Sequence, residues 1–483
     1  MAIEHQPVTT TARSPRRKWS IWRWLMLGCL ALVVVHAIWG WVAGQRLRSV
    51  VAGLRAKGEM TVAADLNGAA VPDADNAALD YWPAGRSIKW DSPAHAAFNK
   101  LEDYRWPLSD QDLATFHAFV MEYAPALALA DTGSKKSRAD WGIKSTTPMH
   151  AVLLRHLSDA RQLAVLLQAA AYDAHGRGDD AQAVHRLLQI LALARAIDAP
   201  PSFNITHMVR MGCDNLATTA LQEMAASLVI EPASPKTPNV KPAQRQQVDA
   251  LLAELTADGV YLADWHRAMA GERVEALDSA DTFISGKMGA WGTPLTGFAA
   301  TGWQAAVKGY VLQPLIFQDA RVMTDALTKV IAAGQSPDWP TATTLAGNPN
   351  FYRANGYLHP WAAEMMGSYD RILLNHFRSW TNRRLAATAL ALRASAADHA
   401  GQLPARLDDL VPGYLPRLPI DPMARGGTTP LRYRATGDDP LIYSVGENGL
   451  DDGGSDVTLP KTNYYSIWNH QDAVVHLTPQ PTE

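Results

Sequence analysis

The stretch "YSVGENGLDDGGSD", residues 443–456, combines acidic and amide side chains with four glycines. Calcium takes about six to eight oxygen ligands, and carboxylates close in sequence supply several of them when glycines let the backbone curl. The D-x-[DN]-x-[DN]-G pattern of an EF-hand loop is not met. A second interpretation is a tight turn at Asn448-Gly449, with the acidic side chains in water. Both interpretations, a calcium loop and a polar turn, stay open.

A second acidic group lies in "GERVEALD", residues 271–278. Glu272, Glu275 and Asp278 recur every three residues, which places them about one turn apart on a helix. Paired carboxylates at this spacing suit general acid–base chemistry. A solvated helix face uses the same spacing, and it is the interpretation that the pattern favours.

Sequence motifs for other chemistry are absent. The histidines form no H-E-x-x-H or H-x-H pattern, and the two cysteines, Cys29 and Cys213, are too few for a zinc cluster. The sequence contains no G-x-S-x-G elbow, phosphate loop or dinucleotide fingerprint. We therefore assign no catalytic residue and no cofactor-binding residue from the sequence.

Composition bounds the class of protein. The chain has 483 residues, of which 47% are hydrophobic and 19% charged, so it can fill large cores. The formal net charge is −3. Because no basic stripe occurs beyond residue 60, we expect no nucleic-acid partner.

An apolar run near the N-terminus predicts a membrane anchor. The run "WLMLGCLALVVVHAIWGWVAGQ", residues 24–45, carries no formal charge. About 20 helical residues cross a hydrocarbon core of about 30 Å. Tryptophans stand at both ends of the run, as in an interfacial aromatic belt. We predict a transmembrane signal anchor over residues 21–44, with the lipid bilayer as its partner. A cleaved signal peptide is the alternative, but no A-x-A site follows the run.

Flanking charges predict the orientation of this anchor. Five basic residues precede the span and four follow it, namely Arg13, Arg16, Arg17, Lys18 and Arg23, then Arg46, Arg48, Arg55 and Lys57. The excess favours a cytoplasmic N-terminus. Residues 1–20 are then a basic cytoplasmic tail. We therefore expect a single-pass protein of the inner (cytoplasmic) membrane with the bulk of the chain in the periplasm.

The middle of the chain is helical in pattern. Residues 45–230 read as a helical domain that begins with a stem helix ending near Gly58, and its clearest part is an antiparallel hairpin over residues 149–197. Residues 231–242 form a proline-rich linker. Residues 243–400 read as a second helical block, and Gly401 stops its last helix.

The C-terminal residues 401–483 form a different module. Short strands are expected at "LRYRA", "LIYSV" and "DAVVHL", residues 431–435, 441–445 and 472–477. The predicted fold class is therefore mainly α: one transmembrane helix, a helical-bundle ectodomain, and a small antiparallel β-sheet module packed on a helix.

The residue order of this module carries a resemblance. "G-x-L-P", "L-x-x-L-V-P-x-Y-L", "L-P-x-D-P", "L-x-Y" and "Y-S-V-G-x-N-G" follow one another from Gly401 to Gly449. In this order the module resembles the C-terminal region of the major pseudopilin of type II secretion systems, over about the last hundred residues. The chain is also similar to a group of membrane-anchored bacterial proteins that carry this module after a long helical region.

The resemblance implies a metal site and also has departures. In the major pseudopilins the loop after the S-x-G strand holds calcium, so the resemblance implies Asp451, Asp452 and Asp456 as ligands, with the Val445 carbonyl as a further donor. A pseudopilin opens with a short leader, a cleavage site and a glutamate early in its apolar helix. Arg23 and Trp24 open the span here. We therefore expect no polymerisation into a pilus.

Three functional hypotheses follow. The first is a non-catalytic envelope scaffold or interaction protein with protein partners in the cell envelope. The second is an extracytoplasmic hydrolase that uses unidentified carboxylates. The third, an accessory component of a type II secretion-like apparatus, rests on the resemblance of the module alone.

Overall fold

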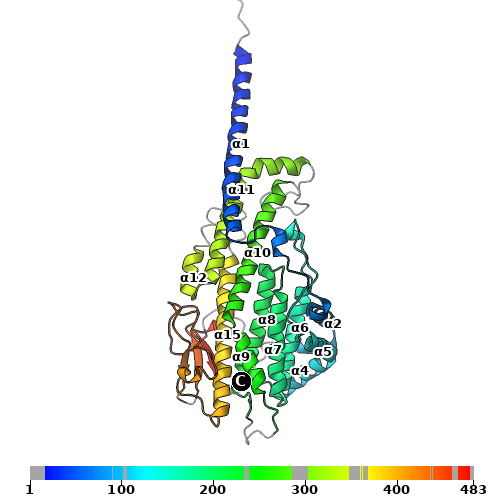
Figure 1. The fold of residues 1–483 in the computed structure, drawn as a ribbon, viewed down its shortest axis with the longest axis vertical. Helices are drawn as coiled ribbons and strands as arrows, with labels where there is room; N and C mark the ends of the chain where they lie inside the picture. The colour runs from blue at the N-terminus through cyan, green and yellow to red at the C-terminus, as the bar shows by residue number, and fades with distance from the viewer. Residues whose placement is uncertain are drawn as a thin grey trace, which may run out of the picture.

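A computed structural model gives the fold of the chain (Figure 1). It describes residues 17–89, 91–101, 106–232, 239–285, 303–347, 359, 362, 368–435, 437, 439–458 and 466–478. Most of the predicted basic tail, residues 1–16, lies outside these residues.

The described chain is mainly helical, with a small antiparallel sheet near its C-terminus, as predicted. The helices are α1 Arg17–Ala56, α2 Ala78–Ser87, α3 Pro93–Phe98, α4 Asp110–Glu122, α5 Ala124–Gly133, α6 His156–Gly176, α7 Asp180–Ile197, α8 Asn204–Met224, α9 Arg245–Leu255, α10 Asp258–Ile284, α11 Trp303–Gly334, α12 Trp339–Ala346 and α15 Tyr369–Asp398. The strands are β1 Arg432–Arg434, β2 Leu441–Ser444 and β3 Ala473–His476.

Helix α1 is one continuous helix of 40 residues that leaves the body along its long axis (Figure 1). Its apolar first part is exposed, with Trp22 68% and Trp41 63% accessible. Its last part packs on the body and buries Leu47 and Leu54. The exposed part has the length and composition of a single-pass anchor or a signal sequence. The predicted stem helix is the continuation of the same helix, which packs one face on the body.

Among the described helices, one other pair has the apolar composition of a membrane span. Helices α4 and α5 reach that length only together, and they bend by 69° at their junction. Both insert side chains into the protein core, including the buried Phe116, Phe119 and Ala126. Their apolar character is therefore accounted for by packing within the body.

Helix α15 is the central helix of the body. It has 30 residues and an alanine- and leucine-rich second half, which favours a long helix. Its first half, with Phe377, packs in a core shared with α10, α11 and α12. Its second half, with Leu390, packs in a larger core shared with α2 to α9 and the C-terminal sheet. Its buried residues lie on most faces of the helix, so α15 is surrounded by other elements.

The C-terminal sheet has the order β1-β2-β3, with both neighbouring pairs antiparallel. In the central strand, Ile442 pairs with Tyr433 on one side and Val475 on the other. Strand β2 packs against α15, and β3 packs against α8. The three expected strands and the packing of the sheet on a helix are therefore confirmed.

The predicted hairpin and linker also have counterparts in the fold. Helices α6 and α7 form the antiparallel hairpin. The described ends of the proline-rich segment are fixed by backbone bonds, because Ala243 donates to the Val229 carbonyl and Lys241 donates to the Gly178 carbonyl. The core around α15 crosses the predicted boundaries at residues 231–242 and 401.

Candidate functional site

The three predicted calcium ligands lie in the loop that follows β2, and each has a different partner. Asp451 accepts hydrogen bonds from Nε of Arg432 at 2.9 Å and Oη of Tyr443 at 3.0 Å. Asp452 accepts from Nδ2 of Asn448 at 3.0 Å. The third, Asp456, has Oδ2 3.5 Å from Nε2 of His476. The hydrogen bond from Arg432 holds the pKa of the Asp451 carboxyl below its usual range.

A fourth aspartate, which the sequence interpretation missed, organises this loop. Asp472 is fully buried and accepts backbone N–H groups of Gly454 at 2.8 Å, Ser455 at 3.1 Å and Asp452 at 3.4 Å. Burial raises the pKa of the Asp472 carboxyl, although these hydrogen bonds oppose the rise. The loop thus turns its N–H groups toward an anion, which is the opposite of the carbonyl cage that surrounds a cation.

The geometry therefore fits calcium poorly at Asp451, because Arg432 already neutralises that carboxylate. Within the part of the chain that the structure describes, no group of three or more His, Cys, Asp or Glu side chains is placed to hold a metal ion. The calcium site at Asp451, Asp452 and Asp456 stays a prediction from the resemblance.

A second missed aspartate plays a similar role in the "L-P-x-D-P" motif. Asp421 is fully buried and accepts hydrogen bonds from Oγ of Ser444 at 2.7 Å, the N–H of Val445 at 3.0 Å and the N–H of Met423 at 2.9 Å. These bonds connect the motif to the end of β2. The aspartate therefore stabilises the module, and its position before a proline was the only sequence signal.

The acidic residues of "GERVEALD" lie on α10 and are not a solvated face. Glu272 and Asp278 are both buried. Glu272 accepts from the backbone N–H of Asn204 at 2.9 Å and from Oη of Tyr369 at 2.7 Å. Asp278 accepts from Oγ1 of Thr147 and the N–H of Met149. We call Glu272, Glu275, Asp278 and Asp281 the acidic face of α10.

These contacts bring three distant segments together on α10. Asn204 is the first residue of α8, so the Glu272 carboxylate acts as its N-terminal cap from another helix. Tyr369 is the first residue of α15, and Thr147 and Met149 lie in the segment before α6. Two of the four carboxylates thus position the ends of neighbouring elements.

Glu275 differs from its neighbours because it is half-buried between two acidic groups. Burial, together with the charges of Glu272 and Asp278, raises its pKa to about 7. Burial also raises the pKa of Asp281, with a further contribution from Asp278. A carboxyl with a pKa near 7 exchanges protons at neutral pH, which is the property of a general acid or base.

A buried ion-pair network joins α8, α10 and α15. Arg210 on α8 is 1% exposed, and its Nη1 lies 2.5 Å from Oδ2 of Asp264 on α10 and 3.7 Å from Oδ2 of Asp198. Asp214, one turn along α8, lies 3.3 Å from Nη1 of Arg383 on α15. Burial by itself would lower the pKa of Arg210. The carboxylates of Asp214, Asp264 and Asp198 outweigh this effect and raise the pKa.

The position of this network indicates a structural role. Its charges are removed from water and face one another across three helices, so each helix is fixed in register by its partners. The spacing of Arg210 and Asp214, four residues apart on α8, is visible in the sequence. Their partners on α10 and α15 are not, because they come from segments more than 50 residues away.

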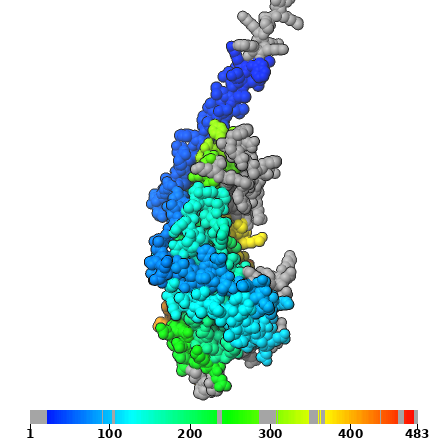
Figure 2. Space-filling view, turned by 90° about the vertical axis from the view of Figure 1, so that its right-hand side faces the viewer, coloured from blue at the N-terminus to red at the C-terminus, as the bar shows by residue number. Residues whose placement is uncertain are grey.

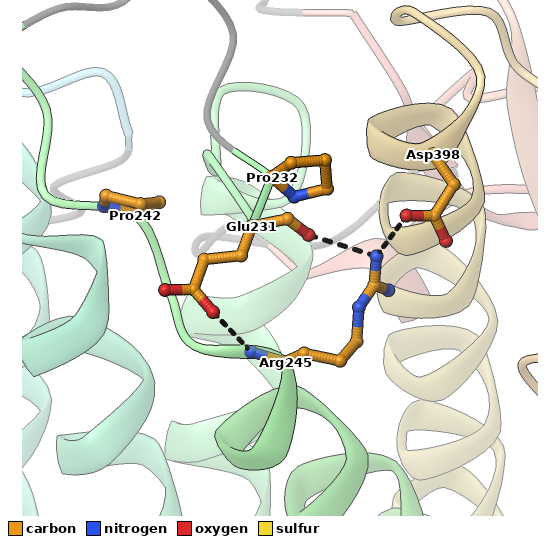
Figure 3. A pocket seen from close by; sticks show the side chains of 5 residues that line it. All are labelled: Glu231, Pro232, Pro242, Arg245 and Asp398. Atoms are coloured by element: carbon orange, nitrogen blue, oxygen red, sulfur yellow. Dashed lines mark hydrogen bonds and ion pairs between the residues drawn. The ribbon is translucent and has the colours of Figure 1, made fainter.

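A surface pocket lies between the described ends of the proline-rich segment and the end of α15 (Figure 3). It is lined by Glu231, Pro232, Pro242, Arg245 and Asp398. The Arg245 side chain donates to Oδ1 of Asp398 at 2.6 Å and to the Glu231 carbonyl at 3.0 Å. The Glu231 carboxylate accepts the backbone N–H of Arg245 at 3.3 Å, so the ion pair of Arg245 with Asp398 and these hydrogen bonds connect the segment to α15.

No protein-family model, curated protein or solved structure matches the chain. The likeness of the C-terminal module to a pseudopilin therefore stays an expectation that rests on its residue order.

Proposed function

We propose that the chain is a non-catalytic, membrane-anchored envelope protein that acts as a scaffold for other proteins. The observation that carries this proposal is the construction of α1. Its exposed apolar part suits a bilayer, and its last part packs one face, with Leu47 and Leu54, on the body without a break in the helix. A continuous helix transmits the position of the anchor to the body, whereas a flexible linker would not.

The rigidity of the body supports the same proposal. The helix α15 runs through both cores, and the network around Arg210 fixes it against α8 and α10. Carboxylates that could act in pairs, Glu272 and Asp278, are instead occupied by hydrogen bonds to neighbouring segments. A body of this kind is suited to holding binding surfaces at a fixed distance from the membrane.

We further propose that the N-terminus is cytoplasmic and the body periplasmic, in line with the excess of basic residues before the span. The test uses the full-length protein in intact cells and in spheroplasts. Alkaline extraction should leave it in the membrane pellet, and external protease should digest the body only after the outer membrane is removed. Release by alkali would refute the anchor, and protection in spheroplasts would refute the orientation.

The scaffold role itself is tested by partner recovery. The full-length protein should bring down envelope proteins from solubilised membranes in fixed proportion. A variant with the apolar part of α1 replaced by an unrelated anchor of equal length separates partners of the body from partners of the span. Recovery of the chain alone at all protein concentrations would contradict the role.

A hydrolase is the second candidate, favoured by the pKa of Glu275 near 7. It predicts hydrolysis of an ester, glycoside or peptide substrate, lost in Glu275→Gln while the fold is retained. If activity survives this substitution, Glu275 is not the catalytic residue. If no activity is found with any of these substrate classes, the scaffold proposal is retained.

The C-terminal module supports a third proposal, an accessory role in a secretion apparatus of type II kind, through its resemblance to a pseudopilin. The same resemblance carries the calcium proposal. Titration calorimetry with the full-length protein should then give a saturable heat that the Asp451→Ala/Asp452→Ala double variant lacks. Equal and negligible heats from both proteins would reject the ion.

A further inference from the structure

The first part of α11, Trp303–Gln313, lies crosswise to α1 at the level where α1 enters the body (Figure 1). Figure 1 shows that α11 then turns and runs down beside α1, and Pro314 inside this helix accounts for the turn. The surface of α11 comes into view directly below the free part of α1 (Figure 2). Two helices that are distant in sequence thus meet at the end of the apolar run.

The side of this crosswise part that faces outward is apolar. Val307, Tyr310 and Val311 are 52%, 52% and 55% exposed. Their spacing of three and four residues places them on one face of the helix. Gly309 faces inward, where a Cβ would lie 2.7 Å from the Ile284 carbonyl oxygen, so α11 rests directly on the end of α10. We call Val307, Tyr310 and Val311 the outer face of α11.

The outer face is continuous with the anchor. Nε2 of His36, inside the apolar run, donates to the Val311 carbonyl at 2.9 Å, and its ring lies 5.2 Å from that of Tyr310. The imidazole of His36 is therefore hydrogen-bonded by α11, as a polar group in an apolar medium must be.

Small residues bring the two helices into close contact below this point. A Cβ on Gly44 would lie 3.0 Å from the Phe317 ring, and one on Gly40 would lie 3.6 Å from Pro314. Close approach at small residues is typical of helices that associate in or near a membrane. The crosswise part of α11 is thus held at a defined height on α1.

That height coincides with the expected edge of the bilayer. A helix rises about 1.5 Å per residue, so the first 20 residues of the uncharged run, 24–43, cover about 30 Å, the thickness of the hydrocarbon core. Pro314 meets α1 at Gly40 and Val311 meets it at His36, about 5 Å and about 10 Å inside the end of that stretch. Helices that lie in the membrane interface bury their apolar face by about 5–10 Å.

We propose that the outer face of α11 is a second membrane contact, with Val307, Tyr310 and Val311 at the boundary of headgroups and acyl chains. This inference rests on the proposed function, because it requires α1 to span the bilayer. The occupant is lipid because the face is continuous with the anchor and lies at the depth of the interface. Tyr310 suits that position, since its ring is apolar and its hydroxyl reaches water.

Three exposed valines allow a matched test. Val33 lies in the apolar run, Val311 on the outer face of α11, and Val260 in the first turn of α10; they are 56%, 55% and 51% exposed. Each is replaced by cysteine in the full-length protein with Cys29→Ala, labelled with an environment-sensitive fluorophore and reconstituted in phosphatidylcholine/phosphatidylglycerol vesicles. Val307→Cys, one turn from Val311, guards against a local effect of one label.

Quenching by lipids that carry a shallow nitroxide is compared with quenching by iodide in water. We expect lipid quenching at Val307 and Val311 to exceed that at Val260 by at least about twofold, because only the former contact the interface. Val33 reports the anchor independently.

Each other outcome overturns the inference in a distinct way. Lipid quenching at Val33 but iodide quenching at Val311 would leave the anchor and reject the second contact. Protection of Val311 from both quenchers would place protein on the outer face, such as a second copy of the chain. A lack of lipid quenching at Val33 would refute the anchor, and the second contact with it.

Discussion

Replacing Glu275 by glutamine should stabilise the protein, although it alters a half-buried residue in the middle of α10. The pKa of this carboxyl rises from 4.5 to about 7 on folding, because of burial and the charges of Glu272 and Asp278. Each pKa unit corresponds to about 1.4 kcal/mol, so ionised Glu275 opposes folding by on the order of 3 kcal/mol. Glutamine resembles the protonated side chain and does not carry this penalty.

The sign of the pH dependence follows from the same shift. Between pH 4.5 and about 7 the folded protein holds a proton at Glu275 that the unfolded chain has lost. The free energy of unfolding therefore decreases as the pH rises through this window. Glu275→Gln should exceed the wild type by about 3 kcal/mol at pH 8 and by less than about 1 kcal/mol at pH 5.

Urea denaturation of the detergent-solubilised full-length protein measures this difference, with the 16 tryptophans as the fluorescent probe. Glu122→Gln, on an exposed position of α4, is the control for the same chemical exchange. Because its side chain lies in water in the folded protein, the exchange should change the free energy of unfolding by less than about 0.5 kcal/mol at either pH. Equal stability of wild type and Glu275→Gln at pH 8, or an equal gain at both pH values, would refute the reasoning.

Three further predictions use the same assay. Arg210→Met should lower the free energy of unfolding by about 3 kcal/mol, because it removes a cation that buried carboxylates of two helices share. Arg321→Met breaks a more exposed pair and should cost no more than about 1 kcal/mol. Similar losses for the two variants would contradict the network. Gly271→Ala should cost about 1–3 kcal/mol because its Cβ would lie 2.3 Å from a backbone oxygen. On the same helix, Gly259→Ala has open space and should gain about 0.5 kcal/mol. Asp472→Asn should cost about 1–3 kcal/mol, since a backbone N–H loses its acceptor, and an unchanged protein would show that the loop forms without it.

Features that depend on local patterns could be predicted from the sequence. The apolar run with terminal tryptophans predicted the exposed part of α1, and the leucine spacing predicted the hairpin of α6 and α7. The alternation of short apolar runs with turn residues predicted all three strands. In each case the signal lies within one element or its immediate turn.

Features that depend on pairing between distant segments could not be predicted. Glu272 and Asp278 have the spacing of a solvated face, and only the approach of Asn204, Tyr369 and Met149 buries them. Asp472 is the first residue of the expected strand at 472–477, and its role becomes visible only when the loop at residues 452–455 folds over it. The sequence shows that a residue carries a carboxylate, but only the tertiary structure shows which groups that carboxylate contacts.

The two proposed membrane contacts together have a consequence that neither has alone. An anchor made of one helix fixes the height of the body but leaves it free to turn about the helix axis and to tilt with the helix. The first part of α11 lies crosswise to that axis and is joined to α1 at His36 and Gly40, and the part of α11 that follows packs on Gly44. If its outer face is in the lipid, rotation about α1 still occurs, but tilt away from the side of α11 would pull Val307, Tyr310 and Val311 out of the interface. The body would then stand at one preferred angle to the membrane, so that a partner on the same membrane meets the same height and inclination of its surface.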